Sequence, residues 1–264
     1  MALSLAGCTV MPVSYTASGG QTPLSSPSPR EPTQGEVSAL QQPTETTEAI
    51  PLRSSTPTLK REIANAQSLQ RLVLSAFPDP PKVTRGDILL LYGQVTNRAG
   101  DPIAGVAVEI WQTDANGIYD HPRAPSTAQR DKTFQFFGTS VTDENGFYLF
   151  RTIIPGRYPP RPRHIHVKVK RGREELLTTQ FYFVSDRDEV RRDGIFQSAG
   201  ENGDLLYIEL VTAADALGRS VLLGRRDMVL NLGSGARRPT PPQTEGPYYP
   251  VTEVSQYDND LVVW

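Results

Sequence analysis

Gly138-Thr-Ser-Val-Thr-Asp-Glu-Asn-Gly-Phe-Tyr-Leu-Phe-Arg151 is the stretch that indicates what kind of fold this chain adopts. Two runs rich in β-branched and aromatic residues flank Asp143-Glu-Asn-Gly146, whose residue types favour a tight turn. The pattern predicts a hairpin of two antiparallel strands, over residues 138–142 and 147–151. The chain therefore contains at least one antiparallel sheet.

Further short strands are predicted on both sides of this hairpin. They cover residues 87–95, 106–111, 164–170, 177–184, 205–211 and 228–232. Turn residues such as Asn97-Arg-Ala-Gly-Asp-Pro102 separate them, and no convincing helix is predicted between them. This spacing predicts a mainly β protein, with an Ig-like or transthyretin-like β-sandwich over residues 82–233.

The segments before this domain have a different composition. Residues 1–8 end in Leu5-Ala-Gly-Cys8, which has the small-residue pattern of a lipoprotein cleavage site. That interpretation requires a start further upstream, because residues 1–7 contain no Lys or Arg; the alternative is a chance cysteine. With Cys8 lipidated the protein would be an extracytoplasmic, membrane-anchored lipoprotein, and without the lipid a cytoplasmic location is the alternative.

Two further segments flank the domain. Residues 9–57 are rich in Ser, Thr and Pro without a hydrophobic period, which predicts a disordered linker, and residues 58–81 predict a short helix with a connector. The tail, residues 234–264, contains Tyr248, Tyr249, Tyr257 and Trp264. We expect it to pack on the sandwich or on a neighbouring subunit of a homo-oligomer, because so much aromatic surface is unfavourable in water.

Composition excludes several classes of protein. The net charge of −2 and pI near 6.0 argue against binding to nucleic acid or to an acidic membrane surface. The single cysteine excludes an intrachain disulfide. No apolar run approaches the length of a membrane span.

Two of the three histidines, His164 and His166, lie at the start of a predicted strand, one residue apart. Residues i and i+2 of a strand project from the same face, so both imidazoles can point at one metal ion. Tyr158 precedes them, and Tyr119 lies in the loop after another strand. Two phenols and two imidazoles would provide hard oxygen and borderline nitrogen donors, a set that suits a ferric ion.

The chain resembles the intradiol ring-cleavage dioxygenases, non-haem Fe(III) enzymes that open catechols between the two hydroxyls. Among them it is similar to the short protocatechuate 3,4-dioxygenase and hydroxyquinol dioxygenase kind. The resemblance spans about residues 84–232 and rests on Gly93-Gln-Val95, Pro102-Ile-Ala-Gly-Val-Ala-Val-Glu-Ile-Trp-Gln-Thr-Asp114, Gly117-Ile-Tyr119, Gly146-Phe-Tyr148, Ile154-Pro-Gly-Arg-Tyr158, His164-Ile-His166 and Thr179-Gln180.

The resemblance implies a role for each of these residues. Tyr119, Tyr158, His164 and His166 would bind Fe(III), and Tyr158 would leave the metal and help to take up the catechol protons. Dioxygen would be incorporated to give a cis,cis-muconate-type diacid.

The resemblance implies two further groups around the metal, an arginine and a glutamine. Arg161, or alternatively Arg163, would stabilise the developing charge, and Gln180 would neighbour the first histidine of the pair. His121 is expected to be an exposed loop histidine, the alternative being a group that supports a ligand.

A non-enzymatic alternative shares much of this pattern. Transthyretin-like and carboxypeptidase-accessory sandwiches also have the Gly-Val turn, the hairpin and the Pro-Gly-x-Tyr turn. In such a binding module Tyr158 would be a packed tyrosine, and His164 and His166 would be one buried and one surface histidine. Tyr119 together with the histidine pair favours the enzyme, because an accessory module has no reason to contain all four.

The chain departs from the family pattern in two places. Only five residues separate Tyr158 from His164, which shortens the loop over the substrate. Thr240-Pro-Pro-Gln-Thr-Glu-Gly-Pro-Tyr-Tyr-Pro250 follows the last strand, whereas such a segment normally precedes the first strand in the family. In the family this segment can border the active site. We therefore expect the tail to reach that same position in space, in its own subunit or in a neighbouring one.

Overall fold

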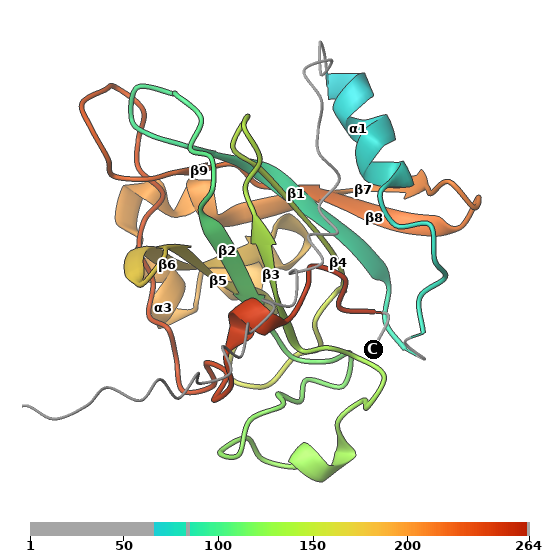
Figure 1. Cartoon of the computed structure of the whole chain (residues 1–264). Coiled ribbons are helices and arrows are strands. Elements are labelled where there is room, and N and C mark those ends of the chain that lie inside the picture. Colours follow the sequence, from blue (N-terminus) through green and yellow to red (C-terminus); the bar gives the residue numbers. More distant parts are fainter. Residues whose placement is uncertain (1–65, 83–84, 263–264) are drawn as a thin grey trace, which may run out of the picture. The chain divides into compact units, whose positions relative to one another are not determined.

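The computed structural model describes residues 66–82 and 85–262 (Figure 1). Cys8, the predicted linker over residues 9–57 and the first part of the predicted helix lie outside the described residues. Within the described ranges, no helix combines the length and the apolar character that crossing a membrane requires.

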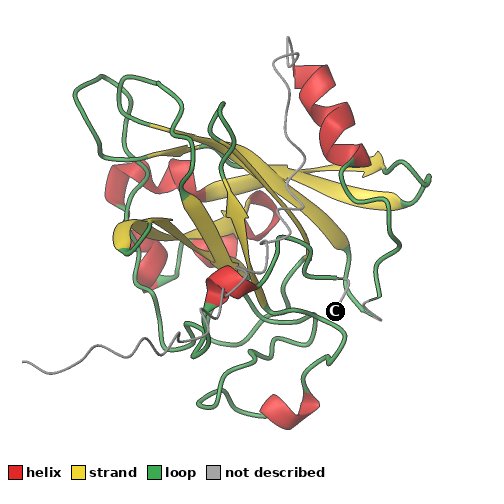
Figure 2. Ribbon diagram, viewed as in Figure 1, coloured by secondary structure: helices red, strands yellow, loops and turns green. Residues whose placement is uncertain are grey.

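The described chain is mainly strand and loop, as Figure 2 shows, and the predicted mainly β class is confirmed. The strands are β1 (Ile88–Thr96), β2 (Ala107–Trp111), β3 (Phe137–Val141), β4 (Phe147–Ile153), β5 (His164–Arg171), β6 (Glu174–Phe183), β7 (Tyr207–Ala214), β8 (Ser220–Arg225) and β9 (Met228–Val229). The helices are α1 (Ala66–Ser75), α2 (Arg187–Val190) and α3 (Gly194–Gln197), with 3-10 turns η1 (Thr127–Gln129), η2 (Val184–Asp186), η3 (Gly200–Leu206) and η4 (Val254–Gln256).

Three sequence expectations about these elements were wrong. Strands β3 and β4 do not form the predicted hairpin, because β3 pairs with β2 and β4 pairs with β1, so the turn over residues 143–146 connects the two ends of the strand order. Helices α2 and α3 lie between β6 and β7, where no helix was expected, because four-residue helices are too short to show a helical period. Strand β8 was not predicted. It pairs antiparallel with β7 and in parallel with β1, and its six residues include Gly224 and Arg225, which weaken the strand pattern.

All nine strands of the described chain belong to one hydrogen-bonded sheet, in the order β3-β2-β5-β6-β7-β8-β1-β4, with β9 pairing β1. One half, β3-β2-β5-β6, is antiparallel throughout. A short parallel contact of β6 with β7 joins it to the other half, at Tyr182 with Tyr207 and Phe183 with Ile208. Both halves contribute to the same buried core, with Ile110 and Val167 from one half and Leu91 and Phe150 from the other.

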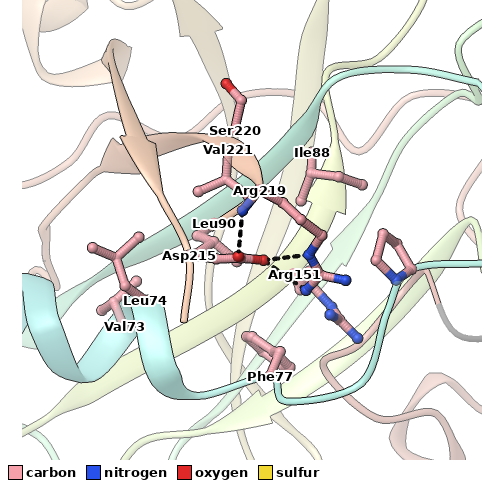
Figure 3. Close-up of a pocket in the computed structure, with 11 residues that line it drawn as sticks. Val73, Leu74, Phe77, Ile88, Leu90, Arg151, Asp215, Arg219, Ser220 and Val221 are labelled. Carbon is pink, nitrogen blue, oxygen red and sulfur yellow. Dashed lines mark hydrogen bonds and ion pairs between the residues drawn. The ribbon is translucent and has the colours of Figure 1, made fainter. Parts of the chain in front are cut away.

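Strand β1 shows how the alternation of side chains builds two layers of packing. Leu89 and Leu91 point into the main core, whereas Leu90 between them packs with Val73 and Phe77, which belong to α1 and the residues after it. Figure 3 shows the small pocket at this junction, with those side chains around Leu90. Helix α1 therefore covers the outer face of the sheet at β1.

The C-terminal residues are part of the core. Leu261 and Val262 are fully buried, and Leu261 exchanges backbone hydrogen bonds with Gln135 and Arg151 on two different segments. Asp260 accepts two hydrogen bonds from the Arg151 guanidinium, which is almost fully buried. The last described residues thus tie the β2–β3 loop to β4.

Candidate functional site

Strand β5 places two imidazoles on one face of the sheet. His164 and His166 are 3% and 1% exposed, and their Nε2 atoms are 3.1 Å apart. The Nδ1 atom of His164 lies 2.7 Å from the carbonyl oxygen of Pro162. Because a carbonyl oxygen only accepts, Nδ1 carries the proton of this hydrogen bond, and Nε2 keeps its lone pair.

Tyr158 lies in the connection between β4 and β5. Its hydroxyl oxygen is 3.4 Å from His164 Nε2, and a backbone bridge with Arg161 holds its turn. Its ring is only partly buried. Tyr158 is therefore the member of the group that solvent or a small ligand can reach.

Tyr119 comes from the long β2–β3 loop, and Asp114 shapes that loop. The buried Asp114 carboxylate accepts hydrogen bonds from the backbone N–H groups of Asn116, Ile118 and Asp131, at 2.8, 3.0 and 2.8 Å. Gly117 has φ +81°, and a Cβ there would lie 1.9 Å from the Arg157 carbonyl oxygen. The two tyrosine-bearing loops are thus in backbone contact.

The structure brings all four predicted ligands together, and we call them the tyrosine–histidine cluster: Tyr119, Tyr158, His164 and His166. The Tyr119 ring centroid lies 5.3 Å from that of Tyr158 and 6.1 Å from that of His166. Tyr119 is 4% exposed, and its hydroxyl has no hydrogen-bond partner among the described residues. The interpretation of one buried and one surface histidine was wrong, since both are buried.

Burial sets the protonation of the cluster. It lowers the pKa of His164 to about 3, helped by the Arg161 charge, and lowers the pKa of His166 well below its usual value. Burial also raises the pKa of Tyr119 and, less strongly, that of Tyr158, where the Arg161 charge acts in the opposite direction. The imidazoles are therefore neutral, the form in which they bind metals.

The donor set decides which metal would fit. Within residues 66–82 and 85–262, His, Cys, Asp and Glu side chains form no group of three or more able to hold a metal ion. The tyrosine–histidine cluster instead offers two imidazole nitrogens and two phenol oxygens. The unpartnered Tyr119 hydroxyl is the kind of buried polar atom that a ligand to the cluster would satisfy. Such donors fit a ferric ion, because phenolate is a hard anionic ligand.

Of the two candidate arginines, Arg161 is the one whose charge acts on the cluster histidines, and Arg163 is paired elsewhere. Arg161 donates to Asp193 at 2.6 Å and to Gln180 Oε1 at 2.8 Å, and its charge lowers the pKa of both cluster histidines. Arg163 instead makes a two-bond ion pair with Asp186, at 2.6 and 2.7 Å.

Gln180 corrects one expectation about the sheet. It lies opposite His166, the second histidine of the pair, whereas Tyr182 lies opposite His164. The β5–β6 register sets this pairing, which no local pattern reports. The Gln180 Oε1 accepts a hydrogen bond from Arg161, so Gln180 contacts the arginine whose charge acts on the cluster.

His121 is not the exposed loop histidine that was expected, because it is 2% exposed. Its Nδ1 accepts a hydrogen bond from the Arg123 backbone N–H, and its ring lies 5.7 Å from that of Tyr248. The tail covers His121, and only the tertiary structure reveals that cover.

The C-terminal segment, residues 240–250, lies against the cluster within the same chain. The Tyr248 ring is 4.8 Å from Tyr119 and 6.1 Å from Tyr158, and a Cβ on Gly246 would lie 3.2 Å from His166. Sequence reasoning did not assign Tyr248 to the site, although the aromatic residues of the Pro-rich tail were a signal for it.

Hydrogen bonds and charges hold this segment to the sheet. Backbone and side-chain bonds link Gln243 to Thr178 and Gln180 to Thr244. The Tyr249 hydroxyl donates to the buried Glu109 at 2.8 Å. Lys168 pairs with Glu245 and lies 3.9 Å from the centre of the Tyr249 ring.

Comparisons with known proteins agree with this arrangement. The profile of a protein family described as Dioxygenase matches residues 63–231. The chain is 36% identical over 124 residues to the protocatechuate 3,4-dioxygenase beta chain of Burkholderia cepacia, covering 44% of this chain and 52% of that protein. It is 34% identical over 116 residues to catechol 1,2-dioxygenase 1 of Acinetobacter lwoffii, covering 37% of this chain and 36% of that protein. The chain thus matches about half, or less, of the length of these relatives.

A solved structure is also similar, that of the dioxygenase domain of a dioxygenase carbohydrate-binding protein fusion from Streptomyces sp. SirexAA-E. The two chains are 31% identical with a TM-score of 0.42, over 60% of this chain and 92% of the other.

Proposed function

Because the chain belongs to the intradiol ring-cleavage dioxygenase family, we propose that it uses Fe(III) and dioxygen to cleave a catechol-type ring to a cis,cis-muconate-type dicarboxylic acid. The observation that carries the proposal is the gathering of two phenols and two neutral imidazoles in one buried cluster. Tyr119, Tyr158, His164 and His166 would hold the iron. When bound, ferric iron supplies the electron-accepting centre that makes a chelated catecholate reactive toward dioxygen.

Tyr158 is the residue suited to handle the catechol proton. It is the more exposed of the two cluster tyrosines, so the incoming catechol can reach its hydroxyl. Tyr158 would take up this proton only from the phenolate form in which it would hold the iron. Burial raises the pKa of its phenol, so the proton would then stay on Oη at neutral pH.

Arg161 is suited to stabilise negative charge that develops on the substrate. Its ion pair with Asp193 and its hydrogen bonds to Gln180 and Tyr182 fix the guanidinium before any substrate enters. A positive group that needs no reorganisation is the most effective kind of electrostatic stabiliser.

The C-terminal segment would exclude water from the reacting ring. Tyr248 and Gly246 already lie against the cluster, which supports a role for the tail as one wall of the site in its own subunit. We propose further that residues 82–233 pack as a two-layer β-sandwich that residues 234–264 complete, since both halves of the sheet contribute to one core.

Iron loading of the purified protein tests the function. Two tyrosine-to-Fe(III) bonds give a wine-red protein with broad visible absorption, which anaerobic addition of a catechol shifts, and later oxygen gives the ring-opened diacid. Tyr158→Phe and His164→Ala should each reduce iron content or turnover, whereas Tyr92→Phe, on the other half of the sheet, should not. A protein that stays colourless and iron-free after loading would overturn the proposal.

Membrane anchoring through Cys8 is a separate proposal that rests on Leu5-Ala-Gly-Cys8 alone. Mass spectrometry of the protein from a membrane fraction tests it. An unmodified Cys8 thiol, or a chain whose mature end lies elsewhere, would contradict it.

A further inference from the structure

A second candidate binding site lies outside the tyrosine–histidine cluster, in a groove of about 550 Å³ between α2, η3 and the end of β8. We call it the arginine groove, because Arg187, Arg191, Arg225 and Arg226 line it. Its size is that of a site for a small organic molecule.

The charges of the groove are unbalanced. Arg187 begins α2 and Arg191 is the residue that caps its end, four positions later, so both lie on one side of this turn and repel each other. Among the described residues, neither guanidinium has a carboxylate or other acceptor within bonding distance. Two acidic residues also line the groove, Asp204, which is paired with Arg238 at 2.6 Å, and Glu209, so the four arginines exceed the acidic residues by two.

The opposite wall carries a second arginine pair. Arg225 is held by Asp227, and Arg226 donates to the Tyr207 carbonyl oxygen at 2.8 Å. The Arg226 Nε and the Tyr207 hydroxyl are shielded from solvent without a hydrogen-bond acceptor in the described chain. The groove is therefore rich in donors and short of acceptors.

An aromatic surface lies beside these charges. The Arg187 guanidinium is 5.2 Å from the centre of the Tyr207 ring, and Phe196 packs on Tyr207 at 5.1 Å. A ligand that combines negative ends with an apolar or conjugated body would match both features.

We propose that the arginine groove binds a small organic dicarboxylate. Arg187 and Arg191 each present the planar fork that matches a carboxylate and can take one end of the dicarboxylate. The Arg226 Nε and the Tyr207 hydroxyl, which lack a partner in the described chain, are the donors for the other end, since the Arg225 fork is held by Asp227. The aromatic surface favours a carbon chain over a compact anion such as inorganic phosphate.

Two successive ring contacts connect the arginine groove with the tyrosine–histidine cluster. His164 contacts Tyr182 at 5.9 Å, and Tyr182 contacts Phe196 at 5.2 Å on α3, which Figure 1 shows beside β6. The ring-opened product of the proposed reaction is a dicarboxylate, so the groove would bind the product of the same protein. The identification of the bound dicarboxylate as the reaction product rests on the proposed function. The choice of a dicarboxylate as the ligand does not.

Calorimetric titration of the full iron-free chain tests the inference. The probe is cis,cis-muconate, and sorbate serves as the matched compound with one carboxylate instead of two, alongside inorganic phosphate. We expect saturable binding of the diacid, with both comparison compounds at least roughly tenfold weaker. Absence of saturable binding, or equal binding of sorbate or phosphate, would overturn the proposal.

Paired variants locate the site. Arg187→Gln/Arg191→Gln should weaken muconate binding roughly tenfold to a hundredfold. Arg171→Gln/Arg173→Gln removes the same charge from the exposed β5–β6 turn and should leave binding unchanged. Equal weakening by both pairs would refute a specific groove. If iron-loaded protein turns over a catechol but muconate does not bind, only the groove proposal is refuted. If muconate binds but there is no turnover, only the proposed reaction is refuted.

Discussion

Replacement of Asp114 by alanine should damage the tyrosine–histidine cluster without touching any of its members. The fully buried Asp114 carboxylate accepts three backbone hydrogen bonds that shape the loop leading to Tyr119. Its backbone oxygen also accepts from Gly156, just before Tyr158. Loss of the carboxylate therefore loosens one tyrosine loop and weakens its contact with the other.

The magnitude follows from these bonds. A hydrogen bond to a charged acceptor contributes roughly 1.5–3 kcal/mol, and neighbouring bonds are not fully additive. We therefore expect Asp114→Ala to lower the free energy of unfolding by about 4 kcal/mol. Asp114→Asn keeps the shape but loses one acceptor oxygen and the charge, so we expect a loss of about 2 kcal/mol.

Urea unfolding gives the stability, and visible absorption after iron loading reports the cluster. Asp114→Ala should lose both stability and colour at temperatures where it is still folded. Asp143→Ala is the matched control, because the Asp143 carboxylate accepts from Asn145 and Phe147 in the β3–β4 turn. It should lose stability but keep its colour. An unchanged spectrum in folded Asp114→Ala, or an equal change in Asp143→Ala, would refute the reasoning.

Three other substitutions probe the surroundings of the cluster. Gly246→Ala places a methyl group at φ +77° against His166, and thermal unfolding should show a loss of about 1–2 kcal/mol, which an unchanged melting temperature would contradict. Asp193→Asn weakens the ion pair that positions Arg161. Steady-state assays should then show turnover reduced about tenfold with iron content unchanged. Full activity of this variant would contradict the proposed role of Arg161. Leu261→Ala opens a cavity in the core and should cost about 2–5 kcal/mol in urea unfolding, and a cost below about 1 kcal/mol would show that the tail packs loosely.

Much of the fold could be predicted because strand formation leaves a local record. The turn around Asp143 was predicted, and its side-chain bonds to Asn145 and Phe147 account for it. The two strands that it joins pair with β2 and β1 and not with each other, because strand pairing is decided by the whole sheet. Helices α2 and α3 left no such record, because four-residue helices are too short to show a helical period. The burial of His121 left no local record either, because the tail covers it from the other end of the sequence.

For the candidate site, the sequence by itself determined the chemistry of the donors and the shared face of His164 and His166, because the alternation of a strand is a local property. Only the tertiary structure decided that the Tyr119 loop reaches them, that Gln180 lies opposite the second histidine, and that Tyr248 closes the cluster. Those facts depend on strand register and on contacts between residues far apart in the chain. Burial and hydrogen bonding select such contacts over the whole fold, and no short stretch of sequence records them.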